Sequence, residues 1–343
     1  MKVLYAIQGS GNGHISRAKE IIPALKNRVQ VDVLISGTQV DLDLPFPVKY
    51  RFKGVGFVFG KRGGINYYQT LRNNNIFRII KEIRQCDVKQ YDLIINDFEP
   101  ISAWASYLRN TVNCVSLSHQ YALLYPSVPK PKKRSFLSSF LLRNYAPSTI
   151  GYGLHFKSYS KSIFPAIIRS DIRKQSIKHK NYYVVYLPAY SDERIIKVLS
   201  KIKKSKWKVY SKHAKEDYKV KSIQVKSIRT SKSFETSLSR CKGVICGAGF
   251  ETPAEALYLN KKLMVVPMKG QYDQRCNAES LRQLGVEVLS EFNESKLYQI
   301  MRWMNTKQSI DLQFPDKTQF IIDEIISNHI LATELSHRIF QET

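Results

Sequence analysis

The sequence of 343 residues contains only five cysteines, and no two of them form a Cys-x-x-Cys pair. An odd number of scattered cysteines argues against a disulfide framework and favours reduced thiols. The sequence also lacks an apolar run of the roughly 18–20 residues that a membrane-spanning helix requires. A strand-like segment follows Met1 directly, without the pattern of a signal peptide. We therefore expect a cytoplasmic protein.

Acidic residues are also few. The sequence has 28 Asp and Glu residues and 54 Lys and Arg residues, which gives a formal net charge of +26. Such an excess would attract phosphates, anionic lipid or nucleic acid. A genome bias toward Lys, Ile, Asn and Tyr would produce the same excess by scattering lysines over solvated surfaces. Because the sequence contains no helix-turn-helix, zinc-ligand or aromatic RNA-binding pattern, we expect no nucleic-acid partner.

The rest of the composition is typical of a folded protein with two domains. Hydrophobic residues make up 43% of the sequence, and a chain of this length is expected to divide into two domains of about 150 residues each. Apolar, β-branched segments alternate with segments of helical period over residues 2–119, and the alternation returns over residues 181–284. This pattern predicts an α/β protein with two Rossmann-like parallel sheets.

The segment between the two alternating series has a different character. Residues 126–180 contain five prolines and many Lys and Arg residues. We therefore predict an N-terminal domain over residues 1–165 and a C-terminal domain over residues 166–327. The last helix, at about 328–343, is expected to pack back on the N-terminal domain.

A glycine-rich segment, QGSGNGHISRA at residues 8–18, follows the first predicted strand and opens a helix. Glycines allow a ligand to approach the backbone closely, and a helix N-terminus offers free N–H groups to an anion. The residues that we assign to the phosphate and acceptor side are Gly11, Asn12, Gly13 and Arg17 of this segment, together with Glu99 and His119 from later strand ends. A dinucleotide-binding loop would need glycine where His14 stands, and no Gly-Lys-Ser/Thr of a triphosphate-binding loop follows.

Polar side chains near the ends of three predicted strands are candidates for catalysis. His14 stands at the mouth of the first strand-to-helix loop, where open α/β sheets bind ligands. Asp97 ends another strand and is expected to face the same crevice, orient the imidazole and raise its basicity. Glu99 is an alternative partner, although either acid would also suit the cap of the helix after Pro100. His119, at the end of the next strand, is expected to face the crevice too.

The longest motif covers residues 246–286 (CGAGFETPAEALYLNKKLMVVPMKGQYDQRCNAESLRQLGV). A strand leads through a Gly-Ala-Gly turn into a helix with Thr252 as its expected N-cap, which predicts a second anion site. Glu255 lies one turn further, where a carboxylate can accept hydrogen bonds from a ribose diol. Asp273 and Gln274 open the next helix with side chains suited to sugar hydroxyls.

This stretch resembles the donor-binding signature of GT-B glycosyltransferases, which include the secondary-product UDP-glycosyltransferases and the peptidoglycan N-acetylglucosaminyltransferase. The matching residues are Gly249, Thr252, Glu255, Ala256, Pro267, Asp273, Gln274, Asn277 and Ala278. The Gly-His at residues 13–14 is similar to the one near the start of those enzymes. The chain departs from the signature at residues 260–262, where Asn-Lys-Lys replaces Gly-x-Pro. It departs also at Gly247, where many members have a phosphate-binding His, and at Glu251, where they have Asn.

The resemblance implies two Rossmann-like domains that face a cleft, and a metal-independent glycosyltransferase without a cofactor. The donor is a nucleotide-diphosphate sugar with UDP or dTDP, and transfer is expected to invert the anomeric centre. The residues assigned to the donor are Gly247, Ala248, Gly249, Phe250, Glu251, Thr252, Glu255, Asp273 and Gln274. His14 is implied as the base that deprotonates the acceptor hydroxyl, with Asp97 as its supporting acid. Asp41-x-Asp43 matches the metal-binding motif of another glycosyltransferase fold, but it lies in a proline-containing loop, and we regard the match as chance.

The acceptor is expected to be a small molecule, a glycan or a lipid-linked molecule that meets the N-terminal domain. Residues 129–145 (PKPKKRSFLSSFLLRNY) place basic residues around an apolar centre, which suits a helix lying on anionic lipid at the inner face of the membrane. A core helix with charged flanks has the same pattern. Other functions left open are a nonhydrolysing UDP-N-acetylglucosamine 2-epimerase, a basic protein that binds nucleic acid or an anionic surface, and a catalytically silent sugar-nucleotide binder.

Overall fold

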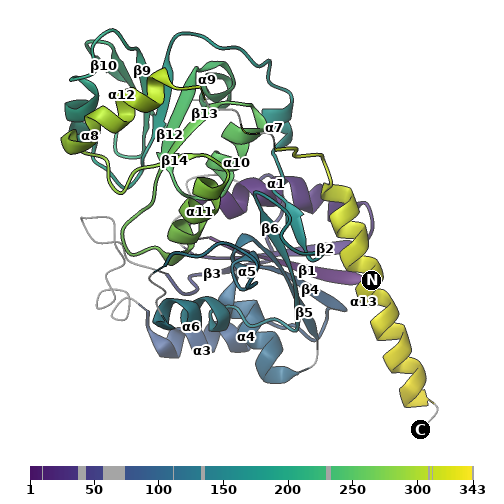
Figure 1. The fold of residues 1–343 in the computed structure, drawn as a ribbon. Coiled ribbons are helices and arrows are strands. Elements are labelled where there is room, and N and C mark those ends of the chain that lie inside the picture. The colour runs from purple at the N-terminus through teal and green to yellow at the C-terminus, as the bar shows by residue number, and fades with distance from the viewer. Residues whose placement is uncertain are drawn as a thin grey trace.

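The computed structural model contains two β-sheets flanked by helices, one sheet in each half of the chain (Figure 1). The structure describes residues 1–9, 11–37, 44–56, 74–110, 112–132, 136–228, 233–307, 310 and 312–341. Each sheet has seven strands, and nearly all neighbouring strands are parallel. The predicted α/β class with two parallel sheets is therefore confirmed.

The first sheet has the strand order β3-β2-β1-β4-β5-β6-β7. Its strands are β1 (Lys2–Gln8), β2 (Gln30–Ser36), β3 (Tyr50–Phe52), β4 (Leu93–Asp97), β5 (Asn113–Ser118), β6 (Ile150–His155) and β7 (Ile163–Pro165). The described helices that accompany it are α1 (Asn12–Lys26), α3 (Ile76–Gln85), α4 (Pro100–Arg109), α5 (His119–Ala122) and α6 (Phe136–Asn144). Because these strands run in one direction, the carboxyl ends of β1, β4 and β5 lie at the same edge of the sheet.

The second sheet has the order β10-β11-β9-β8-β12-β13-β14, and only the β10–β11 pair is antiparallel among its described strands. The strands are β8 (Tyr183–Tyr186), β9 (Trp207–Ser211), β10 (Tyr218–Val220), β11 (Ile223–Ser227), β12 (Gly243–Gly247), β13 (Lys262–Val266) and β14 (Glu287–Val288). The helices are α7 (Ser170–Arg173), α8 (Asp192–Leu199), α9 (Phe234–Arg240), α10 (Glu251–Tyr258), α11 (Tyr272–Gln283), the short η1 (Glu294–Lys296) and α12 (Leu297–Asn305).

Strand β1 lies in the middle of the first sheet and is covered on both faces. Its alternate residues belong to two separate hydrophobic clusters, since Tyr5 packs with Ile21 of α1 and Leu4 packs with Ile101 of α4. A parallel strand covered by helices on both faces needs a continuous apolar run. The run from Val3 to Ile7, all without exposed surface, meets this requirement.

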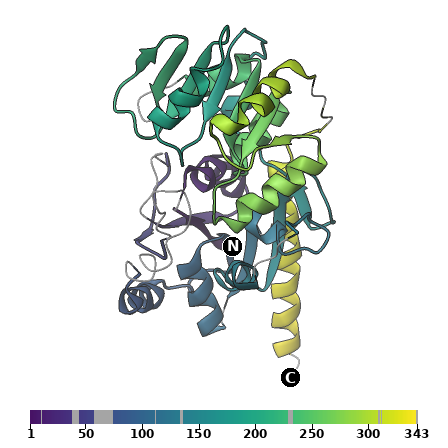
Figure 2. The same ribbon diagram turned by 60° about the vertical axis from the view of Figure 1, so that its left-hand side comes forward.

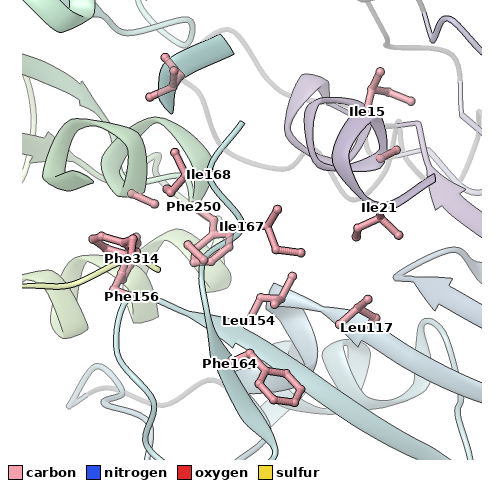
Figure 3. Close-up of a cluster of buried hydrophobic side chains, with 14 of the residues drawn as sticks. Ile15, Ile21, Leu117, Leu154, Phe156, Phe164, Ile167, Ile168, Phe250 and Phe314 are labelled. Carbon is pink, nitrogen blue, oxygen red and sulfur yellow. The ribbon is translucent and has the colours of Figure 1, made fainter. Parts of the chain in front are cut away.

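The apolar cluster around α1 continues into the second half of the chain (Figure 3). Phe250, which directly precedes α10, lies 5.2 Å from Phe156 between ring centroids. The same ring stacks on His119 at 4.1 Å between centroids. The two halves of the protein therefore meet through buried aromatic rings as well as through polar groups.

The C-terminal helix α13 (Thr318–Gln341) runs along the side of the first half in both views (Figures 1 and 2). Arg28, just after α1, donates hydrogen bonds of 2.8 and 2.9 Å to the two carboxylate oxygens of Asp323. The helix begins at Thr318 rather than near residue 328. The division at residues 165 and 166 lies between β7 and β8 and stays a prediction. Within the described part of the chain, no helix combines the length and apolarity that crossing a bilayer requires.

Candidate active site

A cleft of about 810 Å³ lies between the carboxyl edges of the two sheets. Gln8, Phe98 and His119 line it at the ends of β1, β4 and β5, and Gly247 and Val266 line it at the ends of β12 and β13. Open α/β sheets bind ligands at this edge, so both halves present their binding edge to one space. Predicted site residues that line the cleft are Gly11, Asn12, Gly13, His14, Arg17, His119, Gly247, Gly249, Phe250, Glu251, Thr252, Glu255, Asp273 and Gln274. The remaining ones, Asp97, Glu99 and Ala248, are fully buried.

The structure brings His14 and Asp97 together. Helix α1 begins at Asn12, so His14 lies in its first turn, and the His14 Nδ1 atom lies 3.0 Å from Asp97 Oδ1 at the end of β4. A carboxylate can only accept, so Nδ1 carries the hydrogen and donates to Asp97. The Nε2 atom of a neutral His14 then holds the lone pair that a base needs.

Asp97 has a second partner, the cationic Arg17, one turn further along α1. The Arg17 Nη2 atom donates to both Asp97 oxygens at 2.7 and 2.9 Å, and Nε donates to Oδ2 at 3.2 Å. Burial acts to raise the pKa of Asp97, but Arg17 and His14 outweigh it and hold this pKa below its usual value. Asp97 is therefore an ionised carboxylate, which fixes the tautomer of His14.

The alternative in which Glu99 supports His14 is wrong. Glu99 is the N-cap of α4, because its carboxylate accepts hydrogen bonds of 2.7 Å from the backbone N–H groups of Ile101 and Ser102. Two hydroxyl groups, of Ser36 and Ser102, donate to the same carboxylate. These contacts lie within the first domain beneath the cleft surface, so the capping interpretation of Glu99 is the correct one.

On the opposite side of the cleft, β12 leads through Gly247, Ala248 and Gly249 into α10. The helix begins at Glu251, with Phe250 as its N-cap and no side-chain hydrogen bond to the cap. Thr252 therefore lies inside the first turn and is not the N-cap that the sequence predicts. The N-terminal end of α10 lines the cleft. Backbone N–H groups at a helix N-terminus point away from the helix and can bind an anion there.

Glu251 extends from α10 to the first domain, where it accepts a hydrogen bond from Arg17 Nη1. Gly13 leaves room for this contact, since a Cβ atom at that position would lie 3.1 Å from Glu251 Cγ. Burial raises the pKa of Glu251 to about 7, although Arg17 acts in the opposite direction. The acid that departs from the signature is thus balanced by a cation from the other domain.

Glu255 lies one turn further along α10 and is held by Arg169, a residue that the sequence analysis missed. The Arg169 Nε and Nη2 atoms donate to the two Glu255 oxygens at 2.5 and 3.0 Å, and Nη1 donates to Glu235 at 3.0 Å. Arg169 lies in the irregular segment between the two sheets, outside every motif. No sequence signal connects it with a residue 86 positions away.

Asp273 and Gln274 lie in the first turn of α11 and line the cleft beside α10. The Gln274 Oε1 atom accepts from the Met268 backbone N–H at 3.0 Å, and Nε2 donates to Gln271 Oε1. Burial raises the pKa of Asp273. These contacts fix the amide of Gln274 against the loop after β13.

His119 lines the cleft as predicted, but its ring also joins the two domains. Its Nε2 atom lies 2.6 Å from Asn277 Oδ1 on α11, and its Nδ1 atom lies 2.9 Å from the Leu154 carbonyl. Burial lowers the pKa of His119 to about 4. Asn277 in turn donates to the Ala248 carbonyl at 3.1 Å, so the His119 contact supports the loop before α10.

The Asp41-x-Asp43 motif lies outside the described residues. Among the residues that the structure describes, no group of three or more His, Cys, Asp and Glu side chains is arranged to hold a metal ion.

Comparison with known proteins gives a family and a fold. The family model described as glycosyl transferase family 1 matches residues 1–305. MurG of Acinetobacter baumannii is 15% identical with a TM-score of 0.58, covering 95% of this chain and 99% of MurG. Arabidopsis thaliana UGT89C1, solved with UDP, is 13% identical with a TM-score of 0.58, covering 96% and 99%. The spinosyn rhamnosyltransferase SpnG, solved with thymidine diphosphate, is 11% identical with a TM-score of 0.53, covering 97% and 96%.

No curated protein sequence matches the chain significantly. At identities this low, the likeness to the solved structures concerns the fold, and it confirms the predicted GT-B architecture of two sheets that face a cleft.

Proposed function

Because the chain belongs to glycosyl transferase family 1, we propose that it transfers a hexose from a nucleotide-diphosphate sugar to an acceptor hydroxyl, with His14 as the base. The observation that carries this proposal is the contact between His14 and Asp97 at the edge of the cleft opposite α10 and α11. A base on one domain and an anion site on the other suit a reaction between an acceptor and a nucleotide donor.

In the proposed reaction, His14 Nε2 takes the proton of the acceptor hydroxyl as its oxygen attacks the anomeric carbon. The bond between that carbon and the diphosphate breaks, and the electron pair leaves with the diphosphate. Attack opposite the leaving group inverts the anomeric centre. Asp97 stabilises the imidazolium that forms, because its ionised carboxylate accepts from Nδ1.

The negative charge that develops on the leaving group must be stabilised by hydrogen-bond donors of the C-terminal domain. The first turn of α10 has no side-chain cap. Pro253 has no N–H group and the Ala254 N–H donates to the Phe250 carbonyl, so the N–H groups of Glu251 and Thr252 are the ones we propose for the diphosphate, and the helix dipole favours an anion there. Fixed dipoles of this kind stabilise a leaving group without a metal ion. Gly247 to Thr252 are the residues that we propose for this contact, and Arg17 balances the charge of Glu251 beside it.

The remaining donor contacts follow from the order of residues along the cleft. We propose that Glu255 accepts from the ribose hydroxyls and that Asp273 and Gln274 contact the transferred sugar. The solved neighbours carry UDP in UGT89C1 and thymidine diphosphate in SpnG, which supports UDP or dTDP as the nucleotide. An isomerase of the 2-epimerase type would instead convert UDP-N-acetylglucosamine without an acceptor, so product analysis with donor alone distinguishes the two reactions.

On the acceptor side, we propose peripheral binding to an anionic membrane surface. Helix α3 exposes Phe77 and α6 exposes Phe140, and both helices carry basic residues, such as Arg78 and Arg143. Side chains in α3 and just after α6 donate hydrogen bonds to the same segment, residues 54–55. Arg78 donates to the Gly54 carbonyl at 2.9 Å, and Tyr145, just after α6, donates to the Val55 carbonyl at 2.7 Å. Apolar rings with basic neighbours suit a surface of anionic lipid, although Lys133 and Arg134 lie outside the described residues.

The test of the proposed function is a thermal-shift screen of the purified protein against UDP, dTDP, GDP, CDP, NAD and a short DNA duplex. Ligand at about 100 times its dissociation constant stabilises by roughly 2.7 kcal/mol, which is a shift of a few degrees. We expect selective stabilisation by UDP or dTDP. Stabilisation by DNA alone, or by no nucleotide, would contradict the proposal.

A further inference from the structure

Two glutamine side chains in the N-terminal half of the cleft each hold an unused hydrogen-bond acceptor. Gln8 and Gln120 both line the cleft. Their Oε1 atoms are buried and have no hydrogen-bond partner within the described part of the chain. Buried carbonyl oxygens are nearly always paired, because leaving one without a donor is destabilising. Two unpaired amide oxygens in one cleft therefore point to a ligand that supplies donors.

The orientation of the Gln8 amide follows from its neighbours. The Val55 carbonyl can only accept, so the Tyr145 hydroxyl, 2.7 Å away, donates its hydrogen there. The Tyr145 oxygen then accepts from Gln8 Nε2 at 2.7 Å. This chain of contacts assigns the amide nitrogen of Gln8 to the tyrosine and leaves Oε1 unpaired. Only 1% of Gln8 is exposed, so its amide is largely shielded from solvent.

Aromatic side chains lie beside the Gln8 amide. Tyr145 stacks on Phe98 with 4.7 Å between ring centroids. Phe98 directly follows Asp97 and has a left-handed backbone conformation, with φ of 57°, that a bulky side chain adopts only when its surroundings hold it there. Leu141 and Leu142 of α6 also line the cleft. None of these side chains carries a charge, so the surface suits a neutral group.

The strands that lead to the two glutamines end at a separation that one small ring can bridge. Gln8 ends β1 and Gln120 lies just after the end of β5, and these strands are separated in the sheet by β4 alone. Neighbouring strands are about 4.8 Å apart, so the two strand ends are about twice that distance apart. A six-membered ring with a hydrogen bond of about 2.8 Å at either side can bridge such a gap. Asp97 ends the strand between them, which puts the bridged group beside His14.

We propose that this part of the cleft binds a hydroxylated ring of the acceptor, that is, a glycosyl unit. Gln8 Oε1 and Gln120 Oε1 each accept a hydrogen bond from a ring hydroxyl, and the C–H face of the ring packs on Phe98 and Tyr145. The inference rests on the proposed transferase function and names its acceptor class. A sugar ring offers the several hydroxyl donors that these oxygens lack, whereas an apolar alcohol offers a single one.

The test is binding, measured by calorimetry with UDP at saturation, of phenyl β-glycosides of glucose, galactose, mannose and N-acetylglucosamine. The matched probe without a sugar ring is 2-phenoxyethanol. We expect at least one glycoside to bind more tightly than 2-phenoxyethanol. Gln8→Leu and Gln120→Leu should each weaken the binding of that glycoside about tenfold, the loss of one hydrogen bond. The exposed Gln283→Leu is the control and should leave it unchanged.

The affinity for UDP separates this inference from the proposed function. Unchanged UDP affinity in both variants, with weakened glycoside binding, supports the inference. If UDP binds but no glycoside exceeds 2-phenoxyethanol, or if the variants bind glycosides like the wild type, the inference is overturned while the transferase proposal stands. If UDP fails to bind the wild type, the transferase proposal fails first. Should Gln8→Leu fold poorly because Tyr145 loses its donor, Gln120→Leu decides the outcome.

Discussion

Arg17 and Glu251 form an ion pair across the cleft, although 234 residues separate them in the sequence. Arg17 also binds Asp97 through two of its nitrogens. One buried guanidinium therefore joins Asp97, the proposed partner of the base in the first domain, to the proposed donor loop of the second. This pairing explains how Glu251 is tolerated where the resembled signature has an uncharged Asn.

The first prediction concerns the titration of Glu251. Burial raises its pKa from 4.5 to about 7, so the folded protein holds this proton more tightly than the unfolded chain. The resulting stabilisation is complete below pH 4.5 and is lost as the pH rises through about 7. Relative to Glu251→Gln, the wild type should lose up to about 3 kcal/mol of unfolding free energy across this window.

Urea unfolding at a series of pH values measures this difference. The exposed Glu216→Gln is a matched control and should keep the pH profile of the wild type. Parallel profiles for the wild type and Glu251→Gln would show that Glu251 titrates in the folded protein as it does in the unfolded chain.

The second prediction concerns Arg17. Replacement by Met keeps much of the side-chain volume but leaves the buried Asp97 carboxylate without its bidentate partner. Breaking a buried ion pair on one side costs about 3–5 kcal/mol. We expect a loss of unfolding free energy of this size, and we expect Asp97→Asn in the same protein to restore part of it. Additive losses in a double-mutant cycle would contradict a direct interaction.

The third prediction concerns turnover. His14→Ala should lower kcat by about 10²–10⁴, the usual contribution of a general base, while the affinity for the nucleotide stays unchanged. Asp97→Asn should also lower kcat, because an amide can present its NH₂ group to Nδ1 and favour the wrong tautomer. Steady-state rates with the donor that the thermal-shift screen identifies measure this effect. The exposed His179→Ala is the control, and normal turnover in His14→Ala would remove the histidine from the mechanism.

The contact between His14 and Asp97 was predictable in outline because both residues were expected at the carboxyl edge of one parallel sheet. Asp97 ends one predicted parallel strand and His14 follows the end of another at the start of a helix, and the carboxyl ends of parallel strands share one edge of a sheet. The structure pairs Ile7 with Asp97 across β1 and β4, which puts the loop with His14 beside the carboxylate. Periodicity and glycine positions were enough for this part of the site.

Contacts that depend on how the two domains meet were not predictable in the same way. The sequence offers no signal that Arg17 pairs with Glu251 or that Asn277 pairs with His119, because neither pair is local and neither follows a strand register. Glu99 shows a different limit of prediction from sequence. The sequence allowed both a catalytic and a capping role, and only the hydrogen bonds to Ile101 and Ser102 decide for the cap.

The fourth prediction concerns the membrane. Phe77 is 79% exposed and Phe140 is 54% exposed, so replacing both with Ser should leave the fold intact. We expect the wild type to sediment with vesicles of phosphatidylglycerol at low salt, and the double variant to sediment at half that level or less. Tyr298→Ser, at a residue 73% exposed on α12 of the other domain, is the control. If the wild-type protein stays in the supernatant, the proposed membrane binding is contradicted.

The last prediction concerns Arg169, whose planar guanidinium holds both oxygens of Glu255 and thereby fixes the direction of that carboxylate. Arg169→Lys keeps the charge but cannot form the two parallel hydrogen bonds, so Glu255 should lose its orientation toward a ribose diol. We expect UDP affinity to fall about tenfold, as it should in Glu255→Gln, and to fall little further in the double variant because both changes disrupt one contact. Calorimetry with UDP measures all three, with Arg282→Lys on the exposed side of α11 as the control. Wild-type affinity in Arg169→Lys would mean that the donor does not depend on this pair, and the ribose contact would then have to be sought elsewhere in the cleft.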